Sequence, residues 1–316
     1  MDETSDHEGS DFIPRGDEGA VLHLVRFGEL ALKSRYVRRQ LQDRLVSNIE
    51  EMFLAERREC LVTADFGRIY VRADDDALAR SVLARTFGVV SFSPVAETPS
   101  ELASLCLAAG EYAKPLLKAG MSFAIRARRA GTHPYTSQDV GREAGSAVWN
   151  AVPGLRVDLT NPDREIFIEV RENKAYLFHE VLQGPGGLPL GTQGRAVALV
   201  ETERDLAAAW LLMRRGARTT IATTGEESMA APLRRWDVRL KVQRIEALAD
   251  LAEVVRASRA QALGLPWGVD RVGTREELRE IAGEAVVFFP LAGLPEDEVA
   301  RILQRIRIGA RLDLTA

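Results

Sequence analysis

The chain has 316 residues, of which 46% are hydrophobic and 28% charged, and its formal net charge is −4. This length is enough for two or three domains of an ordinary globular protein. No apolar run approaches the ~20 residues that a membrane-spanning helix needs, so we expect no membrane partner. A slightly acidic chain gives no global support for a nucleic-acid partner, and such a role would depend on local basic clusters.

The first 20 residues are strongly acidic. They contain seven acidic residues and one arginine, a charge of −6 that leaves the rest of the chain at +2. Because they lack an apolar segment, they do not resemble a signal peptide. We therefore expect residues 1–20 to form a disordered acidic tail.

The segment from Val21 to Leu117 alternates between strand and helix patterns. Val21–Phe27 is an apolar strand, and a helix follows in which Leu41, Leu45 and Ile49 share one face. We further expect a hairpin of Leu61–Ala64 with Arg68–Arg72, and helices over Leu78–Ala84 and Leu102–Leu117.

Residues from Ser122 onward predict a strand, a helix and three more strands. In Ser122–Arg129, Phe123 and Ile125 point one way while Arg126 and Arg128 point the other, which is typical of a half-buried strand. The elements expected after it are a helix over Thr136–Asn150 and strands over Leu155–Leu159, Glu165–Val170 and Ala175–Val181.

A segment rich in glycine and proline then interrupts the pattern. Residues 184–194 contain five glycines and two prolines, which indicates a domain boundary or a functional loop. Beyond it strands alternate with helices, as in a parallel sheet covered by helices. The expected strands are Ala196–Val200, Arg218–Thr223 and Val286–Phe289, and the expected helices are Asp205–Arg214, Leu240–Leu263, Leu278–Ile281 and Glu296–Ile306.

Four motifs resemble the tRNA 4-thiouridine sulfurtransferases in order and spacing. They are Phe27–Lys33, Ser122–Arg129 with Pro134–Ser137, Val157–Asp163, and Gly184–Gly194. The resemblance implies an α/β protein with an α+β front half: a ferredoxin-like domain, a THUMP RNA-binding domain and a Rossmann-like, PP-loop-type domain with a parallel sheet. We place these domains at residues 21–77, 78–183 and 196–316, with a Gly/Pro linker loop at 184–195.

The same resemblance implies tRNA as a partner, and a basic cluster fits that role. Arginines gather at the end of one strand and on the next helix, whose first residues are of the N-cap type and could seat a phosphate. The candidate RNA-binding residues are Lys33, Arg126, Arg128, Arg129, Thr136, Ser137 and Arg142. A solvated strand face and an ordinary N-cap are the alternative interpretation.

The third domain departs from the family at its phosphate loop. The family has Ser-Gly-Gly-x-Asp-Ser there, and the matching positions in this chain are Val200, Glu201, Thr202, Glu203, Arg204 and Asp205. No glycine remains to let backbone N–H groups wrap a pyrophosphate. Three carboxylates stand in the loop, and two unit charges ~4 Å apart repel by about 4 kcal/mol at an effective dielectric near 20. We interpret the loop as degenerate, with Thr202 and Asp205 forming a helix-capping pair.

Cysteine chemistry also departs from the family. Cys60 and Cys106 are the only cysteines, too few for a disulfide framework, and no residue cluster has metal-ligand spacing. Val200–Ala316 contains no cysteine, so no thiolate is available in this segment, where the family transfers sulfur. We also expect no rhodanese-like extension. We expect buried thiols, a reducing cytoplasm and no metal site.

The sequence thus leaves three hypotheses. The first is a tRNA-binding homologue without its own adenylation or sulfur transfer, and with no catalytic residue and no cofactor. A separate sulfur donor or modification enzyme is its candidate partner. The second is a functional sulfurtransferase that takes sulfur from a partner or has a relocated site, in which case ATP and magnesium would persist. The third is a protein scaffold without an RNA role. A homodimer is compatible with each.

Overall fold

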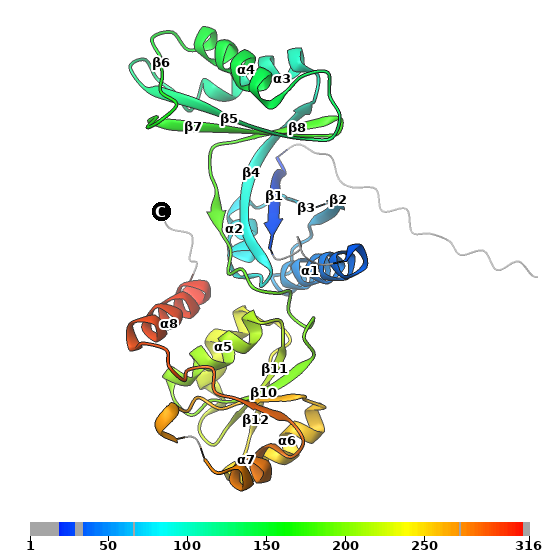
Figure 1. Ribbon diagram of the computed structural model, residues 1–316, viewed down its shortest axis with the longest axis vertical. Coiled ribbons are helices and arrows are strands. Elements are labelled where there is room, and N and C mark those ends of the chain that lie inside the picture. Colours follow the sequence, from blue (N-terminus) through cyan, green and yellow to red (C-terminus); the bar gives the residue numbers. More distant parts are fainter. Residues whose placement is uncertain (1–18, 29–33, 66, 272, 312–316) are drawn as a thin grey trace, which may run out of the picture.

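The computed structural model describes residues 19–28, 34–65, 67–271 and 273–311. Figure 1 shows three tiers, with α3 and α4 at one end, α1 and α2 in the middle and α5 to α8 at the other end. The predicted acidic tail lies outside the described residues except for positions 19 and 20. None of the helices in the described ranges is both long and apolar enough to cross a bilayer.

The front half of the chain contains nine strands and four helices within the described residues. The strands are β1 (Val21–Phe27), β2 (Leu61–Asp65), β3 (Arg68–Ala73), β4 (Val89–Pro99), β5 (Ser122–Ala130), β6 (Arg156–Val157), β7 (Arg164–Arg171), β8 (Lys174–Phe178) and β9 (Leu182–Gln183). The helices are α1 (Arg35–Ala55), α2 (Asp76–Arg85), α3 (Leu102–Ala113) and α4 (Ser137–Ala151).

The back half alternates strands with helices. Its strands are β10 (Arg195–Leu199), β11 (Arg218–Thr223), β12 (Lys241–Arg244), β13 (Ala262–Gly264) and β14 (Val286–Phe288). Its α-helices are α5 (Leu206–Arg214), α6 (Leu251–Ser258), α7 (Arg275–Ala282) and α8 (Glu296–Arg311), and short 3₁₀ segments are η1 (Glu203–Asp205), η2 (Glu227–Arg235), η3 (Leu248–Asp250) and η4 (Val269–Arg271).

One continuous sheet runs through the first two tiers. Its order is β2-β3-β1-β4-β8-β7-β5-β6, and β9 adds to β4. Strand β4 joins the tiers, because its first residues pair with β1 while Ala96–Pro99 pair with β8. This strand was not predicted from the sequence, and it contains Pro94 and Pro99, which are unusual in a central strand. Each tier still has its own core.

Each of these two cores lies between the sheet and the helices that pack against it. In the middle tier, Leu45, Ile49 and Phe53 of α1 pack on the strands, as their helical spacing predicted. In the end tier, Val140, Ala144 and Val148 of α4 pack with α3 and strand residues such as Ile166 and Ile168. The middle tier is the ferredoxin-like domain, and the end tier has the helix-covered sheet expected of the THUMP domain.

The back half is a five-stranded parallel sheet in the order β12-β11-β10-β13-β14. Helices cover both faces: α5 and α8 contribute to one core cluster, and α6 and α7 to the other. This is the Rossmann-like architecture that the alternating pattern predicted. The strand order reverses between β10 and β13, and crevices beyond the carboxyl ends of such strands are where this architecture binds ligands.

The predicted long helix over Leu240–Leu263 is wrong. The segment forms β12, η3, α6 and β13. Helix α6 begins only in the middle of this segment, after η3. The Asp250 carboxylate caps that start, because it accepts hydrogen bonds from the backbone N–H groups of Glu246 and Ala247, both at 2.9 Å. That helix ends at Arg259, which has the left-handed φ of +51°. Local capping therefore overrides the apolar spacing that favoured one helix.

The Gly/Pro loop packs tightly between the two halves. A Cβ atom at Gly184 would lie 2.2 Å from the Val89 carbonyl oxygen, and one at Gly187 would lie 2.1 Å from that of Arg214. Gly187 also has a φ of +74°. These contacts require glycine, so the unusual composition of the loop follows from the joint between the domains.

Side chains reinforce this joint. Phe87, which follows α2, packs against Trp210 and Trp236 of the back half, with ring centroids 5.5 and 5.3 Å away. Glu51 of α1 forms ion pairs with Arg218 and Arg239 of the back half, at 3.6 and 3.1 Å. The parallel sheet is thus fixed against the ferredoxin-like domain.

Candidate nucleic-acid interface

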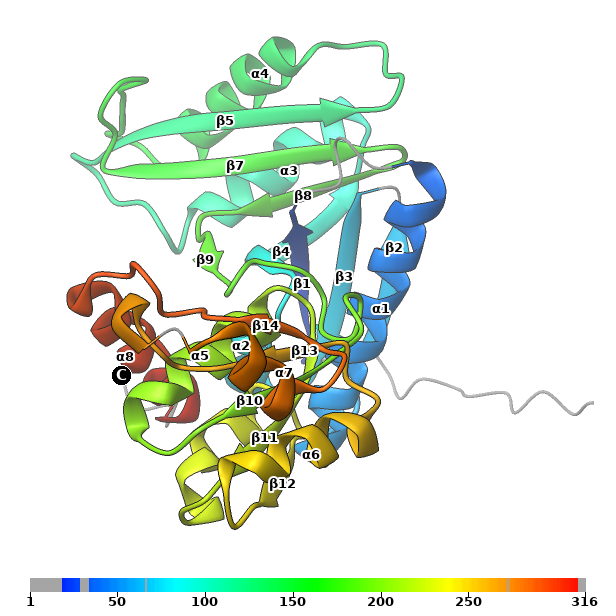
Figure 2. The same cartoon turned by 60° about the horizontal axis from the view of Figure 1, so that its bottom comes forward.

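A large cleft opens between strand β5 and helix α4. Its volume is about 1010 Å³, and four of the predicted RNA-binding residues line it: Arg126, Arg128, Ser137 and Arg142. Strand β6 pairs with the outer edge of β5 only at Ser122 and Phe123. From Ala124 onward, no strand in the described part of the chain pairs with that edge of β5. Figure 2 shows α4 lying alongside β5 at the outer end of the sheet.

Helix α4 contributes a row of small side chains to the cleft. Ser137, Gly141 and Gly145 recur every four residues, and the row ends at Trp149. A Cβ atom at Gly141 would meet nothing within 4 Å, and one at Gly145 would meet only Ile125, 3.9 Å away. The glycines therefore widen the cleft. This row was not predicted from the sequence, although its four-residue spacing is visible there.

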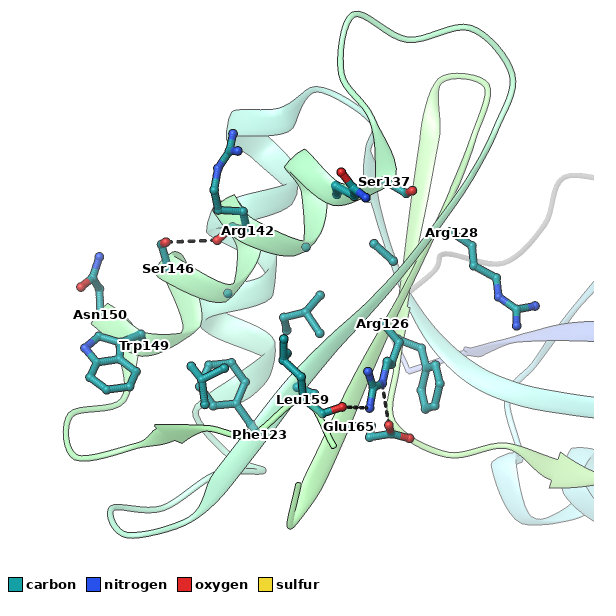
Figure 3. A pocket seen from close by; sticks show the side chains of 18 residues that line it. Phe123, Arg126, Arg128, Ser137, Arg142, Ser146, Trp149, Asn150, Leu159 and Glu165 are labelled. Atoms are coloured by element: carbon teal, nitrogen blue, oxygen red, sulfur yellow. Dashed lines mark hydrogen bonds and ion pairs between the residues drawn. The ribbon is translucent and has the colours of Figure 1, made fainter. Parts of the chain in front are cut away.

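Apolar surface lines the end of the cleft near Trp149. Trp149 is 48% exposed, and Leu159, which lies across the cleft, is 64% exposed. Figure 3 shows the indole ring on α4 and Leu159 on the opposite side. An exposed aromatic ring in a groove is a platform on which an unpaired base can stack.

The arginines of β5 differ in their partners. Arg126 donates to the Glu165 carboxylate at 2.6 Å and to the Leu159 carbonyl at 2.8 Å, so its charge is already paired. Arg129 donates to the Gly131 carbonyl at 2.7 Å, and it does not line the cleft. Arg128 has no carboxylate within ion-pair distance among the described residues, and its side chain is directed away from α4 (Figure 3). Arg128 is therefore the cation of the cleft that remains available.

The start of α4 is an ordinary capped helix. Thr136 is the N-cap, and the Asp139 carboxylate accepts from its backbone N–H at 2.9 Å and its hydroxyl at 2.7 Å. These hydrogen bonds lower the pKa of Asp139, and Arg142 pairs with Asp139 and Glu143. A carboxylate at the helix start opposes anion binding, so the geometry favours the N-cap interpretation of Thr136 over a phosphate seat.

Other predicted features lie elsewhere. Lys33 is outside the described residues. Tyr135 is buried and its hydroxyl donates to the Ser100 carbonyl, so the turn before α4 is packed. Cys60 and Cys106 are half-buried, and burial raises the pKa of both thiols, that of Cys60 to about 12.

The loop after β10 is closed by its own side chains. One oxygen of the Asp205 carboxylate accepts from the backbone N–H groups of Glu201, at 3.0 Å, and Thr202, at 2.9 Å. This confirms the predicted pairing of Thr202 with Asp205. Asp205 is 7% exposed, and Val200, at the start of the loop, is fully buried.

Residues of helix α8 and Thr224, which follows strand β11, pair with the other charged side chains of this loop. Glu203 accepts from Arg307 at 2.6 Å, and Arg204 donates to Glu296 at 2.6 Å, so both pair with α8. The Glu201 carboxylate accepts from the Thr224 hydroxyl at 2.9 Å. Each of the three carboxylates in the loop therefore has a partner within the protein.

Comparison with known proteins assigns the first two tiers. Residues 22–93 match the ThiI ferredoxin-like domain, and residues 100–180 match the THUMP domain. Together with the parallel sheet, these domains define a THUMP protein with a ferredoxin-like domain before the THUMP domain and a Rossmann-like domain after it.

Relatives over longer stretches are tRNA sulfurtransferases. "Probable tRNA sulfurtransferase" of Methanosarcina acetivorans is 43% identical over 225 residues, 69% of this chain and 54% of the relative. "tRNA sulfurtransferase" of Pyrobaculum aerophilum is 31% identical over 326 residues, 90% of this chain and 66% of the relative. The chain belongs to the tRNA sulfurtransferase family. It spans about half the length of the first relatives that it matches.

Solved structures share the whole architecture. PH1313 from Pyrococcus horikoshii Ot3 has a TM-score of 0.79 at 28% identity, covering 91% of this chain and 99% of that chain. A 4-thiouridine synthetase in complex with RNA and bound ATP has a TM-score of 0.72 at 21% identity, covering 93% and 86%. The second likeness establishes a common fold for all three tiers.

Proposed function

We propose that this chain binds tRNA through the cleft between α4 and β5, and that its parallel-sheet domain does not itself carry out ATP-dependent adenylation or sulfur transfer. Membership of the tRNA sulfurtransferase family and the match to the THUMP domain support the first part. The hydrogen bonds of Asp205 carry the second part.

The shape of the cleft suits a single strand of RNA. It is long, open along one edge of β5, and combines an exposed Trp149 with the cation Arg128. Unpaired bases bind proteins by stacking on aromatic rings, while arginine contacts the backbone. A double helix would need a broad basic face, and the paired charges of Arg126 and Arg142 reduce such a face here.

The loop after β10 does not fit a pyrophosphate. A nucleotide phosphate would need the backbone N–H groups at the start of this helix, and the Asp205 carboxylate takes those of Glu201 and Thr202. The side chains that replace glycine keep a ligand from the backbone, and Glu201 and Glu203 add negative charge. The domain then serves as a structural support for the two domains before it.

RNA binding is tested by titrating the chain with tRNA at rising salt. We expect an affinity that falls steeply with salt, and a shallower slope for Arg128→Ala. Arg164→Ala, which removes an exposed arginine of β7 that does not line the cleft, is the control and should retain the natural slope. No binding at low salt would overturn the proposal.

Nucleotide binding is tested by calorimetry with ATP and magnesium. We expect no measurable binding by the natural chain. A variant that restores Ser-Gly-Gly across Val200–Thr202 is the comparison, since it returns the backbone access that the natural loop lacks. Tight binding of ATP by the natural chain would overturn the interpretation of this loop as degenerate.

A second candidate function is uridine thiolation with sulfur from a partner or a relocated site. The observation in its favour is the naming of the relatives as tRNA sulfurtransferases at up to 44% identity. Loss of 4-thiouridine on deleting the gene, restored by the natural chain, would support it, and unchanged nucleoside content would eliminate it. If crosslinking in cells recovers protein but no RNA, a scaffold role replaces both.

A further inference from the structure

A second cavity lies where the ferredoxin-like and THUMP domains meet. Its volume is about 190 Å³, and residues of β1, β5, β7 and β8 line it. The residues that matter for its chemistry are Arg26, Arg126, Arg128, Phe167, Glu169 and Phe178. At about 30 Å³ per water molecule, this is room for several waters or for one small anion with its hydration.

Arg26 is held in place at the bottom of this pocket. It lies on β1, its guanidinium group donates to the Ser93 hydroxyl at 3.0 Å, and it sits 4.7 Å from the centre of the Phe178 ring. Phe178 in turn stacks on Phe167, with ring centroids 5.2 Å apart and planes 9° from parallel. The guanidinium group is thus oriented before any ligand arrives, which reduces the entropy that binding costs.

The pocket has more positive charge than its own carboxylates balance. Burial lowers the pKa of Arg26 to about 10, Glu169 opposes this, and the charges of Arg68 and Arg128 lower it further. Glu169 is already paired with Arg68 at 2.8 Å and Arg171 at 3.2 Å. Among the described residues, neither Arg26 nor Arg128 has a carboxylate within ion-pair distance.

The pocket and the cleft described above share three lining residues, Arg126, Arg128 and Phe167. The Arg128 side chain is directed away from α4 (Figure 3). A strand whose bases lie along α4 would therefore bring its backbone to the edge of β5 beside Arg128. Two guanidinium groups from separate domains could then bind the same phosphate.

We propose that this pocket is a binding site for one phosphate group, held between Arg26 of the ferredoxin-like domain and Arg128 of the THUMP domain. Planar guanidinium groups bind phosphate oxygens with paired, charge-assisted hydrogen bonds. In assigning the phosphate to an RNA backbone, this inference rests on the proposed function. The ligand also links the two domains, because its arginines come from different tiers of the sheet.

The first arm of the test uses inorganic phosphate and adenosine monophosphate, measured by calorimetry at low salt. We expect weak binding of both to the natural chain and its loss in Arg26→Gln and in Arg128→Gln. Arg164→Gln is the matched control and should bind as the natural chain does. Phosphate binding that is unaltered in both pocket variants would overturn the site.

The second arm uses tRNA. We expect Arg26→Gln to weaken tRNA binding about tenfold and to reduce the salt slope by about 0.7–0.9, the value of one phosphate contact. Arg26→Lys keeps the charge without the planar group and should recover only part of the affinity. In the double variant the two losses should be less than additive, since both arginines bind one phosphate.

The outcomes separate this site from the proposed function. If tRNA binds and neither pocket variant changes its affinity or salt slope, the pocket is wrong and RNA binding stands. If tRNA does not bind but phosphate does, and the variants abolish that, the pocket stands and the proposed function fails. Arg128 is exposed, so Arg128→Gln carries the test alone should Arg26→Gln not fold.

Discussion

The cleft of the THUMP domain and the loop after β10 differ in whether their charged side chains have partners within the protein. Both lie beside the first residues of a helix, and both were predicted from the sequence to concern phosphate. In the loop, Glu201, Glu203 and Asp205 all have partners within the protein. At the cleft, Arg128 has no carboxylate partner in the described part of the chain, and a volume of about 1010 Å³ is open next to it.

This difference separates a binding surface from a structural element. Polar groups whose hydrogen bonds are complete within the protein gain little from a ligand, because binding would first have to break those bonds. A cation beside an open cleft has no bond within the protein to break when an anion arrives, and exchanges only its water. The contrast supports the proposal that ligand binding belongs to the front half and that the back half acts as a structural support.

The largest expected effect comes from filling the cleft. Gly141→Phe would place an aromatic side chain where a Cβ atom now meets nothing within 4 Å. We expect the protein to fold, since replacing glycine in a helix removes a penalty of roughly 1 kcal/mol, and tRNA affinity to fall by about 100-fold if two stacked bases are displaced. Gel-shift titration measures the affinity, and circular dichroism the folding.

A graded variant controls for the position itself. Gly141→Ala adds only a methyl group and should raise the melting temperature while reducing affinity far less than Gly141→Phe does. If Gly141→Phe folds and binds tRNA like the natural chain, RNA does not enter the cleft. The cleft would then not differ from the loop after β10 in its ability to bind a ligand.

The next largest effect concerns the aromatic platform. Trp149→Ala should weaken tRNA binding about tenfold, within the roughly 1–3 kcal/mol that one stacked base contributes. Because Trp149 is 48% exposed, we expect little change in the free energy of unfolding. Fluorescence gives a second readout, since a stacked base should quench Trp149, and quenching that persists in Trp149→Ala would assign the signal to another tryptophan.

The sequence predicted the domains well because their motifs are local. The hairpin of β2 and β3, the helical face of Leu45 and Ile49, and the pairing of Thr202 with Asp205 each depend on residues close together in the chain. Capping rules in particular need only a span of three residues. The confirmed features are therefore those in which short-range chemistry decides the structure.

The sequence did not predict the cleft or the phosphate pocket, because both depend on distant segments. Strand β4 joins two domains and was missed, and without it β1 cannot be placed near β5. Arg26 and Arg128 are 102 positions apart and meet only through that shared sheet. Conversely, the helix expected over Leu240–Leu263 was wrong because apolar spacing alone did not reveal the cap at Asp250.

A smaller effect is expected from opening the loop. Asp205→Ala removes the acceptor of two backbone N–H groups and should lower the free energy of unfolding by about 1–2 kcal/mol. Asp250→Ala removes an equivalent cap after β12 and is the matched control. Urea denaturation compares the two, and calorimetry with ATP should show no binding in either. An unchanged urea midpoint in Asp205→Ala would mean that this carboxylate does not close the loop.

The smallest expected effect concerns the reactivity of the two thiols, and it tests whether sulfur chemistry belongs to the front half instead. Burial raises the pKa of Cys60 to about 12 and also raises that of Cys106, so at neutral pH both remain thiols, which are poor nucleophiles. Alkylation by iodoacetamide at pH 8 should be at least about tenfold slower than for free cysteine, whose pKa is near 8.5. The rate should climb as the pH rises further toward these raised values. A fast-reacting thiol in Cys106→Ser would identify Cys60 as a reactive thiolate, and sulfur chemistry would then belong to the same half as RNA binding.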